Sequence, residues 1–340
     1  MKNIYGVTKL ELESFLLDLG FKKFNASQIF EWIYQKKVED FDLMSNLSLD
    51  LRRVLKENFN FNKLEIIDHL SDELADKFLF RLADNEKVEA VLMHHDYGYS
   101  LCISTQVGCN MGCAFCESGR LKKVRNLETH EMVLQILEVE STLNLKITHV
   151  VLMGIGEPFD NYDNVISFID IINDPKSIAL GSRHITVSTS GLIPAIKKFT
   201  EYDKQVNLAI SLHAPNDELR SKLMPVNKAY PLKELMPVLR DYIKKTNRRL
   251  TFEYIMLYEV NDTEQCALEL VKLVKGMNCY INLIPYNETS HIEFKKSTQE
   301  RIMKFYDILK KNNIGVTIRK EFGSKLKAAC GQLRSIYEEG

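Results

Sequence analysis

The stretch ETHEMVLQILEVESTLNLKITHVVLM, residues 128–153, shows the pattern on which the chain is built. Residues 128–143 keep apolar side chains three to four positions apart, which is typical of an amphipathic helix. Residues 147–153 form a short apolar run, which favours a buried strand. Helices that alternate with such strands are the repeat of a parallel α/β sheet.

The same kind of strand recurs along the chain, and a second helical interval, TEQCALELVKLVKGM (263–277), separates two of them. This repeated βα pattern predicts a parallel sheet that closes into a full or partial barrel or opens into a doubly wound sheet. In either case ligands bind at the carboxyl ends of the strands. The other strands are predicted at 101–106, 184–190, 206–213, 250–257, 280–285 and 315–320.

A different pattern precedes the repeats. The amphipathic segments SQIFEWIYQKK (27–37) and LSLDLRRVLKENF (47–59) each place a serine where a helix would begin. They predict a small helical domain over residues 1–62. Alternating apolar and polar residues around Asp84–Glu86 predict a hairpin between Lys77 and Met93. We expect residues 63–95 to join the helical domain to the main domain, residues 96–340.

Composition excludes several classes of protein. The chain has 340 residues, 45% hydrophobic and 27% charged, as in soluble globular proteins. No run approaches the roughly eighteen apolar residues of a membrane span, and the amino terminus carries acids where a signal peptide is apolar. We therefore expect a cytoplasmic protein with no membrane contact. Lysine and arginine (45) balance aspartate and glutamate (46), so binding to nucleic acid would need local basic patches.

Three of the seven cysteines, Cys109, Cys113 and Cys116, follow a predicted strand with C-x3-C-x2-C spacing. Three thiolates on one loop can hold three irons of a [4Fe–4S] cluster and leave the fourth iron open to a small ligand. The alternative is a structural zinc site, which needs four ligands and would have to take Cys102 as the fourth. No second C-x2-C arm accompanies the loop, so the spacing favours the cluster.

This cysteine pattern resembles the cluster motif of radical S-adenosylmethionine (SAM) enzymes. With five further motifs in order, the whole chain is similar to the RlmN-type adenosine C2 methyltransferases of 23S ribosomal RNA and transfer RNA, whose relatives include the Cfr-type C8 methyltransferases. Pro158, where the Cfr-type relatives have alanine, favours the C2 group. The motifs are VLMGIGEP (151–158), ITVSTSG (185–191), LAISLHAPND (208–217), INLIPYN (281–287) and AACGQLR (328–334).

The resemblance implies a partial (β/α) barrel of the radical SAM type with a small helical amino-terminal domain that binds RNA. It also implies a [4Fe–4S] cluster and two SAM molecules per turnover. Taken alone, the glycine motif is explained equally well as a simple turn, and a lone serine or histidine is more often a surface or core residue. The residues that the resemblance implies as SAM contacts are Gly156, Glu157, Ser188, Ser211, Leu212, His213 and Asn287.

Three further residues gain a catalytic interpretation only from the resemblance. It implies that Cys330 is methylated by one SAM and then donates a methylene fragment to RNA. Cys102 would form a disulfide with Cys330 to release the product, and Glu89 would accept a proton. On the residues alone, Cys330 is explained as a buried core cysteine, Cys102 is explained equally well by core packing or by function, and Glu89 is more commonly a solvent-facing carboxylate. Cys266 and Cys279 are expected in the core.

The partners implied are 23S rRNA and tRNA, together with an external one-electron reductant such as flavodoxin or ferredoxin, and we expect a monomer. Basic residues of RLKKVR (120–125), directly after the cysteine loop, are candidates for phosphate contacts. Trp32 with Lys36 and Lys37 is a second candidate, although a core tryptophan is an equal interpretation.

The chain departs from the family at Glu117–Arg120. A C8 methyltransferase and a non-catalytic RNA-binding protein held by a metal remain alternatives.

Overall fold

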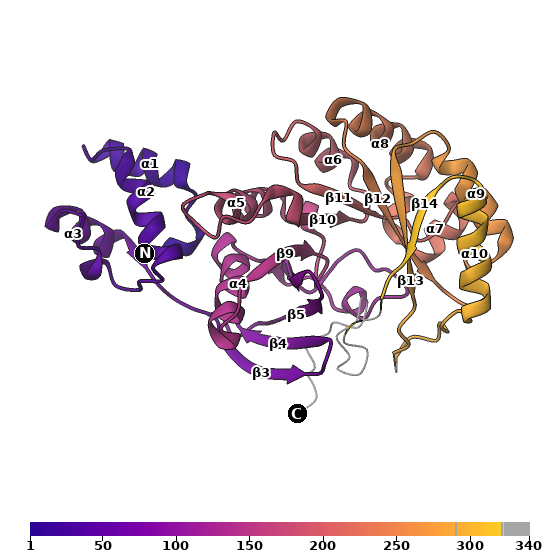
Figure 1. Cartoon of the computed structure of the whole chain (residues 1–340), viewed down its shortest axis with the longest axis horizontal. Coiled ribbons are helices and arrows are strands. Elements are labelled where there is room, and N and C mark those ends of the chain that lie inside the picture. Colours follow the sequence, from indigo (N-terminus) through magenta and orange to yellow (C-terminus); the bar gives the residue numbers. More distant parts are fainter. Residues whose placement is uncertain (290, 321, 323–340) are drawn as a thin grey trace.

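The computed structural model describes residues 1–289, 291–320 and 322. Its centre is a curved sheet of ten strands in the order β14-β13-β12-β11-β10-β9-β6-β5-β4-β3. Helices cover the convex side of the parallel strands, and a separate group of helices stands beside the sheet at the amino terminus (Figure 1). Cys330 lies outside the described residues.

The amino-terminal group contains α1 (Lys9–Asp18), α2 (Phe24–Phe30), a π-helical turn (Glu31–Gln35) and α3 (Leu49–Asn58). The short strands β1 (Lys2–Asn3) and β2 (Phe59–Asn60) pair in parallel and close it. The helical prediction is confirmed.

The two serines predicted to cap helices behave differently. Ser48 caps α3, because its hydroxyl accepts the backbone N–H of Leu51 at 3.3 Å. Ser27 lies inside α2, so the prediction that it caps this helix is wrong. The chain is already helical at Lys23, and the Asn25 side chain accepts the N–H of Lys22 at 3.1 Å, so the helix begins a turn earlier.

Four antiparallel strands follow: β3 (Glu65–Ser71), β4 (Ala75–Arg81), β5 (Lys87–His95) and β6 (Gly98–Cys102). The predicted hairpin is confirmed, because β4 and β5 pair antiparallel around a turn in which Asn85 has a φ of 67°. These strands belong to the same sheet as the parallel strands, because β6 pairs with β9 in parallel. The domain boundaries themselves stay a prediction.

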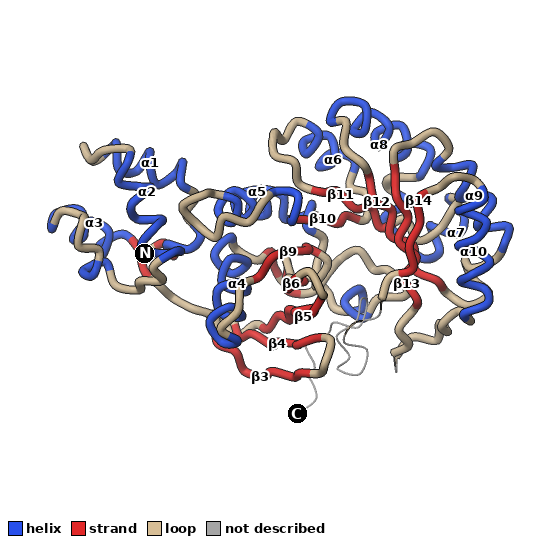
Figure 2. Tube along the Cα trace, viewed as in Figure 1, coloured by secondary structure: helices blue, strands red, loops and turns tan. Residues whose placement is uncertain are grey.

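The parallel part follows the predicted repeat. Each strand pairs with its neighbour in the chain, and the sheet ends at β14 on one side and β3 on the other without closing (Figure 2). The partial barrel is therefore confirmed, and the doubly wound alternative is excluded. The parallel strands are β9 (Ile147–Leu152), β10 (Ile185–Thr189), β11 (Asn207–Ser211), β12 (Leu250–Met256), β13 (Cys279–Pro285) and β14 (Gly315–Ile318).

Alternation along these strands separates two environments. Val150, Val187 and Leu208 face the outer helices and are completely buried with them. Ser188 and Ser211, at alternate positions of the same strands, face the inner, concave side, where polar groups gather. The helices of the outer layer are α4 (Thr129–Leu143), α5 (Tyr162–Asn173), α6 (Ile193–Thr200), α7 (Asp217–Leu223), α8 (Leu232–Thr246), α9 (Glu264–Val274) and α10 (Gln299–Lys311).

Candidate active site

The three clustered cysteines lie on a loop whose base is closed by two short strands, β7 (Gln106–Val107) and β8 (Arg125–Asn126). The loop starts at Gly108, whose φ is +71°, and a Cβ there would lie 2.1 Å from the carbonyl oxygen of Lys122. Only glycine fits such a close approach. The backbone N–H of Cys116 donates to the carbonyl of Cys113 at 3.2 Å, which turns the chain so that the thiols gather.

One cavity of about 160 Å³ joins the three thiols to the carboxyl ends of the neighbouring strands. Its wall includes five of the residues implied as SAM contacts, which come from three separate strand ends. The structure therefore brings together residues that lie far apart in the sequence. These residues are Cys109, Cys113, Cys116, Gly156, Glu157, Ser188, Ser211 and His213.

Glu157 is almost completely buried beside the cysteine loop. Its carboxylate accepts the backbone N–H of Ser190 at 2.7 Å and that of Phe159 at 3.0 Å. Burial raises the pKa of the Glu157 carboxyl, while these hydrogen bonds act in the opposite direction. Gly156 has a φ of +108° and packs against Gln106, so the carboxylate is held by a rigid turn. A fixed carboxylate in a small cavity suits an ammonium group.

His213 has a defined tautomer. Its Nδ1 accepts the backbone N–H of Ile255 at 3.0 Å, so the ring proton of the neutral form is on Nε2. Burial, together with the nearby Arg220 guanidinium, lowers the pKa of His213 to about 3. The ring meets Phe115 of the cysteine loop edge-on, with 4.8 Å between centroids. His213 is thus a neutral N–H donor at physiological pH.

Two of the implied SAM contacts lie elsewhere. The Leu212 side chain is completely buried in the core between the sheet and the outer helices. Asn287 follows β13 by two residues and is buried, but it is not among the described residues that line the cavity. The contacts of both residues with SAM stay predictions.

Arg220 of α7 is a site residue that was not predicted from the sequence. It is completely buried, and its Nη2 donates to the carbonyls of Ser190 at 2.6 Å and Ser211 at 3.1 Å. Its Nε donates to the carbonyl of Leu212 at 3.1 Å, and its Nη1 to the Asn227 side chain at 2.8 Å. Arg220 therefore holds the strand ends that form the cavity. An arginine on a short polar helix gives no sequence signal of such burial.

The thiols fit a positively charged inorganic group. Burial raises the pKa of Cys109 to about 12 and that of Cys113 well above its usual range, so a bound cation would stabilise the thiolate forms. Within the described residues, no three His, Cys, Asp or Glu side chains could hold one metal ion. A [4Fe–4S] cluster has a different requirement, because each thiolate binds its own iron. Three thiols on one loop beside a cavity satisfy it.

Cys102 and Glu89 lie on the concave face of neighbouring strands. Cys102 pairs with Val91 of β5, so Glu89, two residues along, is its diagonal neighbour. Cys102 is buried, and Glu89 is 1% exposed and forms an ion pair with Lys77 at 2.6 Å. The solvent-facing interpretation of Glu89 is therefore wrong, because its side chain is buried against Lys77.

The remaining cysteines behave as predicted where the structure describes them. Cys266 is buried in the core, and Cys279 is half-buried against it. Among the cysteines in the described ranges no disulfide is formed. Cys330 and the motif around it are outside those ranges.

The basic segment RLKKVR mostly binds the protein itself. Lys123 forms an ion pair with Asp160 at 2.6 Å. Arg125 pairs with Asp84 at 2.6 Å and with Glu131 at 2.8 Å. The Arg120 guanidinium donates to the carbonyl of His291 at 2.6 Å. Lys122 is exposed, so RNA contact by this segment stays a prediction that rests mainly on one lysine.

In the second candidate for RNA contact, Trp32 is half-buried, whereas Lys36 and Lys37 are exposed. The Lys36 ammonium lies 3.6 Å from the centre of the Trp32 ring, and the ring N–H donates to Asn46 at 2.6 Å. Lys37 forms an ion pair with Glu140 at 3.7 Å. This surface also stays a prediction.

A partial parallel barrel with a cysteine loop above its strand ends defines the radical SAM class. Comparison with known proteins supports this assignment. Residues 103–271 match the radical SAM superfamily, and residues 2–60 match the ribosomal RNA large subunit methyltransferase N-terminal domain. The crystal structure of a radical SAM methyltransferase from Sphaerobacter thermophilus superimposes with a TM-score of 0.90 at 39% identity, covering 98% of this chain and 99% of that one.

Two curated relatives, both described as probable dual-specificity RNA methyltransferase RlmN, are similar over nearly their whole length. The Spiroplasma citri protein is 52% identical and covers 99% of each chain. The Enterococcus faecalis protein is 51% identical over 98% of this chain and 96% of its own. The chain belongs to the RlmN family of radical SAM, SAM-dependent RNA methyltransferases. No helix in the described part of the chain is long and apolar enough to cross a membrane.

Proposed function

We propose that this chain methylates C2 of an adenosine in 23S rRNA and in tRNA through a methylated Cys330. The observation that carries the proposal is the shared cavity of the three loop thiols with Glu157, Ser188 and His213. The printed description of the relatives as dual-specificity RNA methyltransferases supports the RNA substrate. We infer that the protein works as a cytoplasmic monomer with a one-electron donor such as flavodoxin or ferredoxin.

The cavity residues would orient SAM. Glu157 presents a fixed carboxylate to the ammonium group, and Ser188, Ser211 and the Nε2–H of His213 offer hydrogen bonds to the nucleoside. Cys109, Cys113 and Cys116 would hold a [4Fe–4S] cluster, which supplies the electron for homolytic cleavage of SAM when bound. Arg220 keeps the strand ends in place beneath this site.

Cys330 and Cys102 would carry out the methyl transfer and the release of the product. The Cys330 thiolate takes the methyl group of a first SAM by displacement, releasing S-adenosylhomocysteine. The 5′-deoxyadenosyl group of a second SAM would take a hydrogen atom from this methyl group, and the carbon then bonds to adenine C2. Glu89 accepts the C2 proton, and the remaining unpaired electron passes to the oxidised form of the one-electron carrier. The Cys102 thiolate then attacks the Cys330 sulfur, the carbon released from that sulfur takes up a proton, and methylated RNA and a disulfide are formed. The external reductant restores both thiols.

Lys77 has a positioning role in this scheme. Its ammonium lies 2.6 Å from the Glu89 carboxylate, and both side chains are buried on the concave face. The ion pair places a positive charge directly beside the carboxylate that would accept the proton. It also restricts the Glu89 side chain to the face that carries Cys102.

The test is to trap the covalent intermediate. Cys102→Ala should accumulate protein bonded to RNA, because no thiol resolves the adduct, whereas Cys330→Ala should give neither adduct nor methylation. Cys266→Ala, which changes a core cysteine away from the site, is the control and should turn over normally. Normal turnover of Cys102→Ala, or an adduct in Cys330→Ala, would contradict the proposal.

A further inference from the structure

The amino-terminal half of the barrel interior is open and polar. In complete (β/α) barrels bulky branched side chains fill this region. Here six of the lining side chains are short and polar, and the lining encloses a cavity of about 840 Å³. That volume lies within the range of pockets that enclose small organic ligands. The residues are Ser100, Thr186, Asn207, Thr251, Asn282 and Thr317.

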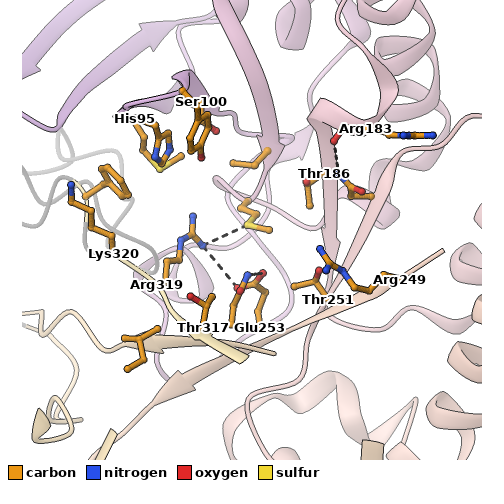
Figure 3. A pocket seen from close by; sticks show the side chains of 18 of the residues that line it. His95, Ser100, Arg183, Thr186, Arg249, Thr251, Glu253, Thr317, Arg319 and Lys320 are labelled. Carbon is orange, nitrogen blue, oxygen red and sulfur yellow. Dashed lines mark hydrogen bonds and ion pairs between the residues drawn. The ribbon is translucent and has the colours of Figure 1, made fainter. Parts of the chain in front are cut away.

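This lower cavity carries a strong positive charge. Among the described residues of its wall, five are basic and one is acidic: Arg183, Arg248, Arg249, Arg319 and Lys320 against Glu253. Glu253 is 3% exposed and lies 4.0 Å from the Arg319 guanidinium, so this single carboxylate offsets at most one of the five positive charges. Figure 3 shows Arg183 and Arg249 on one side of the cavity and His95 on the other.

Two of these arginines are exposed and have neutral neighbours. The Nε of Arg183 donates to the Gln205 side chain at 2.9 Å, and the Arg249 guanidinium lies 5.0 Å from the centre of the Tyr280 ring. Neither forms an ion pair with another residue of the described chain. The contrast is with RLKKVR, where Lys123 and Arg125 are paired with carboxylates. The lower cavity is therefore the better site for phosphate groups.

A column of rings stands at the rim of the same cavity. His184 and His149 stack with centroids 4.4 Å apart, and His95 and Tyr97 stack at 4.6 Å. Tyr97 meets His149 edge-on at 5.2 Å, which joins the two pairs into the ring column. One face of Tyr97 stacks on His95, and the residue is 66% exposed, so the rest of the ring is open to solvent at the rim of the cavity. Exposed aromatic faces stack on unpaired bases.

The lower cavity leads toward the cysteines. Met153, Glu253 and Arg319 line both this cavity and the smaller one that contains the three loop thiols. A nucleotide in the lower cavity would therefore be adjacent to the SAM site. A base within a duplex is already stacked on its neighbours, so the exposed ring favours unpaired RNA.

We propose that the ring column and the exposed arginines Arg183 and Arg249 bind the unpaired nucleotides that flank the target adenosine. Bases stack on Tyr97, and phosphates contact the two guanidinium groups. This inference rests on the proposed RNA methyltransferase function and names the RNA-binding surface of that site.

The experiment measures binding of RNA to the holoenzyme, prepared without oxygen. The probes are a fluorescent RNA stem–loop with an unpaired adenosine-containing loop and a duplex with the same loop sequence paired. Tyr97→Ala should weaken stem–loop binding roughly tenfold or more and leave duplex binding unchanged. Tyr97→Phe keeps the ring and should bind like the parent. Tyr306→Ala, on the outer helix α10, is the matched control.

The phosphate contacts are tested by salt dependence. Arg183→Gln combined with Arg249→Gln should reduce the slope of log affinity against log salt by roughly 1.4, about 0.7 for each phosphate lost. Lys233→Gln with Lys272→Gln, on α8 and α9, controls for net charge. Stem–loop affinity unchanged in Tyr97→Ala together with an unchanged salt slope in the arginine variant would overturn the inference.

The same samples separate this inference from the proposed function. If the parent protein methylates adenosine and all variants bind the stem–loop equally, the surface is wrong and the function stands. If the variants lose binding as expected while the parent leaves RNA unmethylated, the surface is correct and the function is wrong.

Discussion

Arg220→Met should destabilise the fold more than any surface substitution, because it removes the guanidinium that joins β10 and β11 to α7. The side chain is completely buried and donates to three main-chain carbonyls and one amide oxygen. Methionine fills similar space but leaves these acceptors without a donor. Each buried acceptor left without a donor costs about 1–3 kcal/mol, and the sum is partly offset because the charged guanidinium no longer has to be buried. We therefore expect a loss of about 3–5 kcal/mol in the free energy of unfolding.

The assay is urea unfolding of the protein prepared without oxygen, followed by circular dichroism. Arg249→Met is the control, because this arginine is exposed and the change should stay within about 0.5 kcal/mol. Arg220→Lys keeps the charge but lacks the planar fork, so its stability should fall between the other two. An Arg220→Met variant as stable as the parent would refute the view that this residue holds the strand ends.

Two further predictions concern the site. Gly108→Ala should reduce the iron bound after reconstitution to less than half, because the new Cβ would meet the Lys122 carbonyl at 2.1 Å and displace the cysteine loop; iron and sulfide analysis checks this, and full iron content would contradict it. His213 should make stability depend on pH. Its pKa is about 3 in the folded protein and about 6.5 when unfolded, so its contribution is complete above pH 6.5 and is lost toward pH 3, by roughly 1.4 kcal/mol per pH unit. His213→Gln should therefore lose less stability than the parent between pH 7 and pH 5.5 in urea titrations, and equal losses would show that His213 does not titrate in this way.

The parallel strands could be predicted because each is buried on the face toward the helices and reads as a short apolar run between helical stretches. The cysteine spacing likewise placed three thiols on one loop. The pairing of strands that are distant in the sequence was harder to predict. Alternation identified the hairpin of β4 and β5, but nothing local shows that β6 pairs with β9, more than forty residues later.

Burial of charged residues was also hidden from the sequence. Arg220 and Lys77 look like surface cations, and Glu89 looks like a solvent-facing acid, because burial of such residues depends on partners from other elements. The ring column is a similar case, since His149 and His184 stack only after β9 and β10 pair. A motif search finds groups that are close in the sequence, whereas these groups meet only in the folded sheet.

The most direct test of the central claim is nucleoside mass spectrometry of RNA treated with the reconstituted holoenzyme, SAM and a one-electron reductant. The substrates are unmodified 23S rRNA and tRNA, and the Cys330→Ala protein is the control. We expect 2-methyladenosine in RNA treated with the parent protein and none with Cys330→Ala. Finding 8-methyladenosine, or unmethylated RNA while SAM is cleaved, would contradict it.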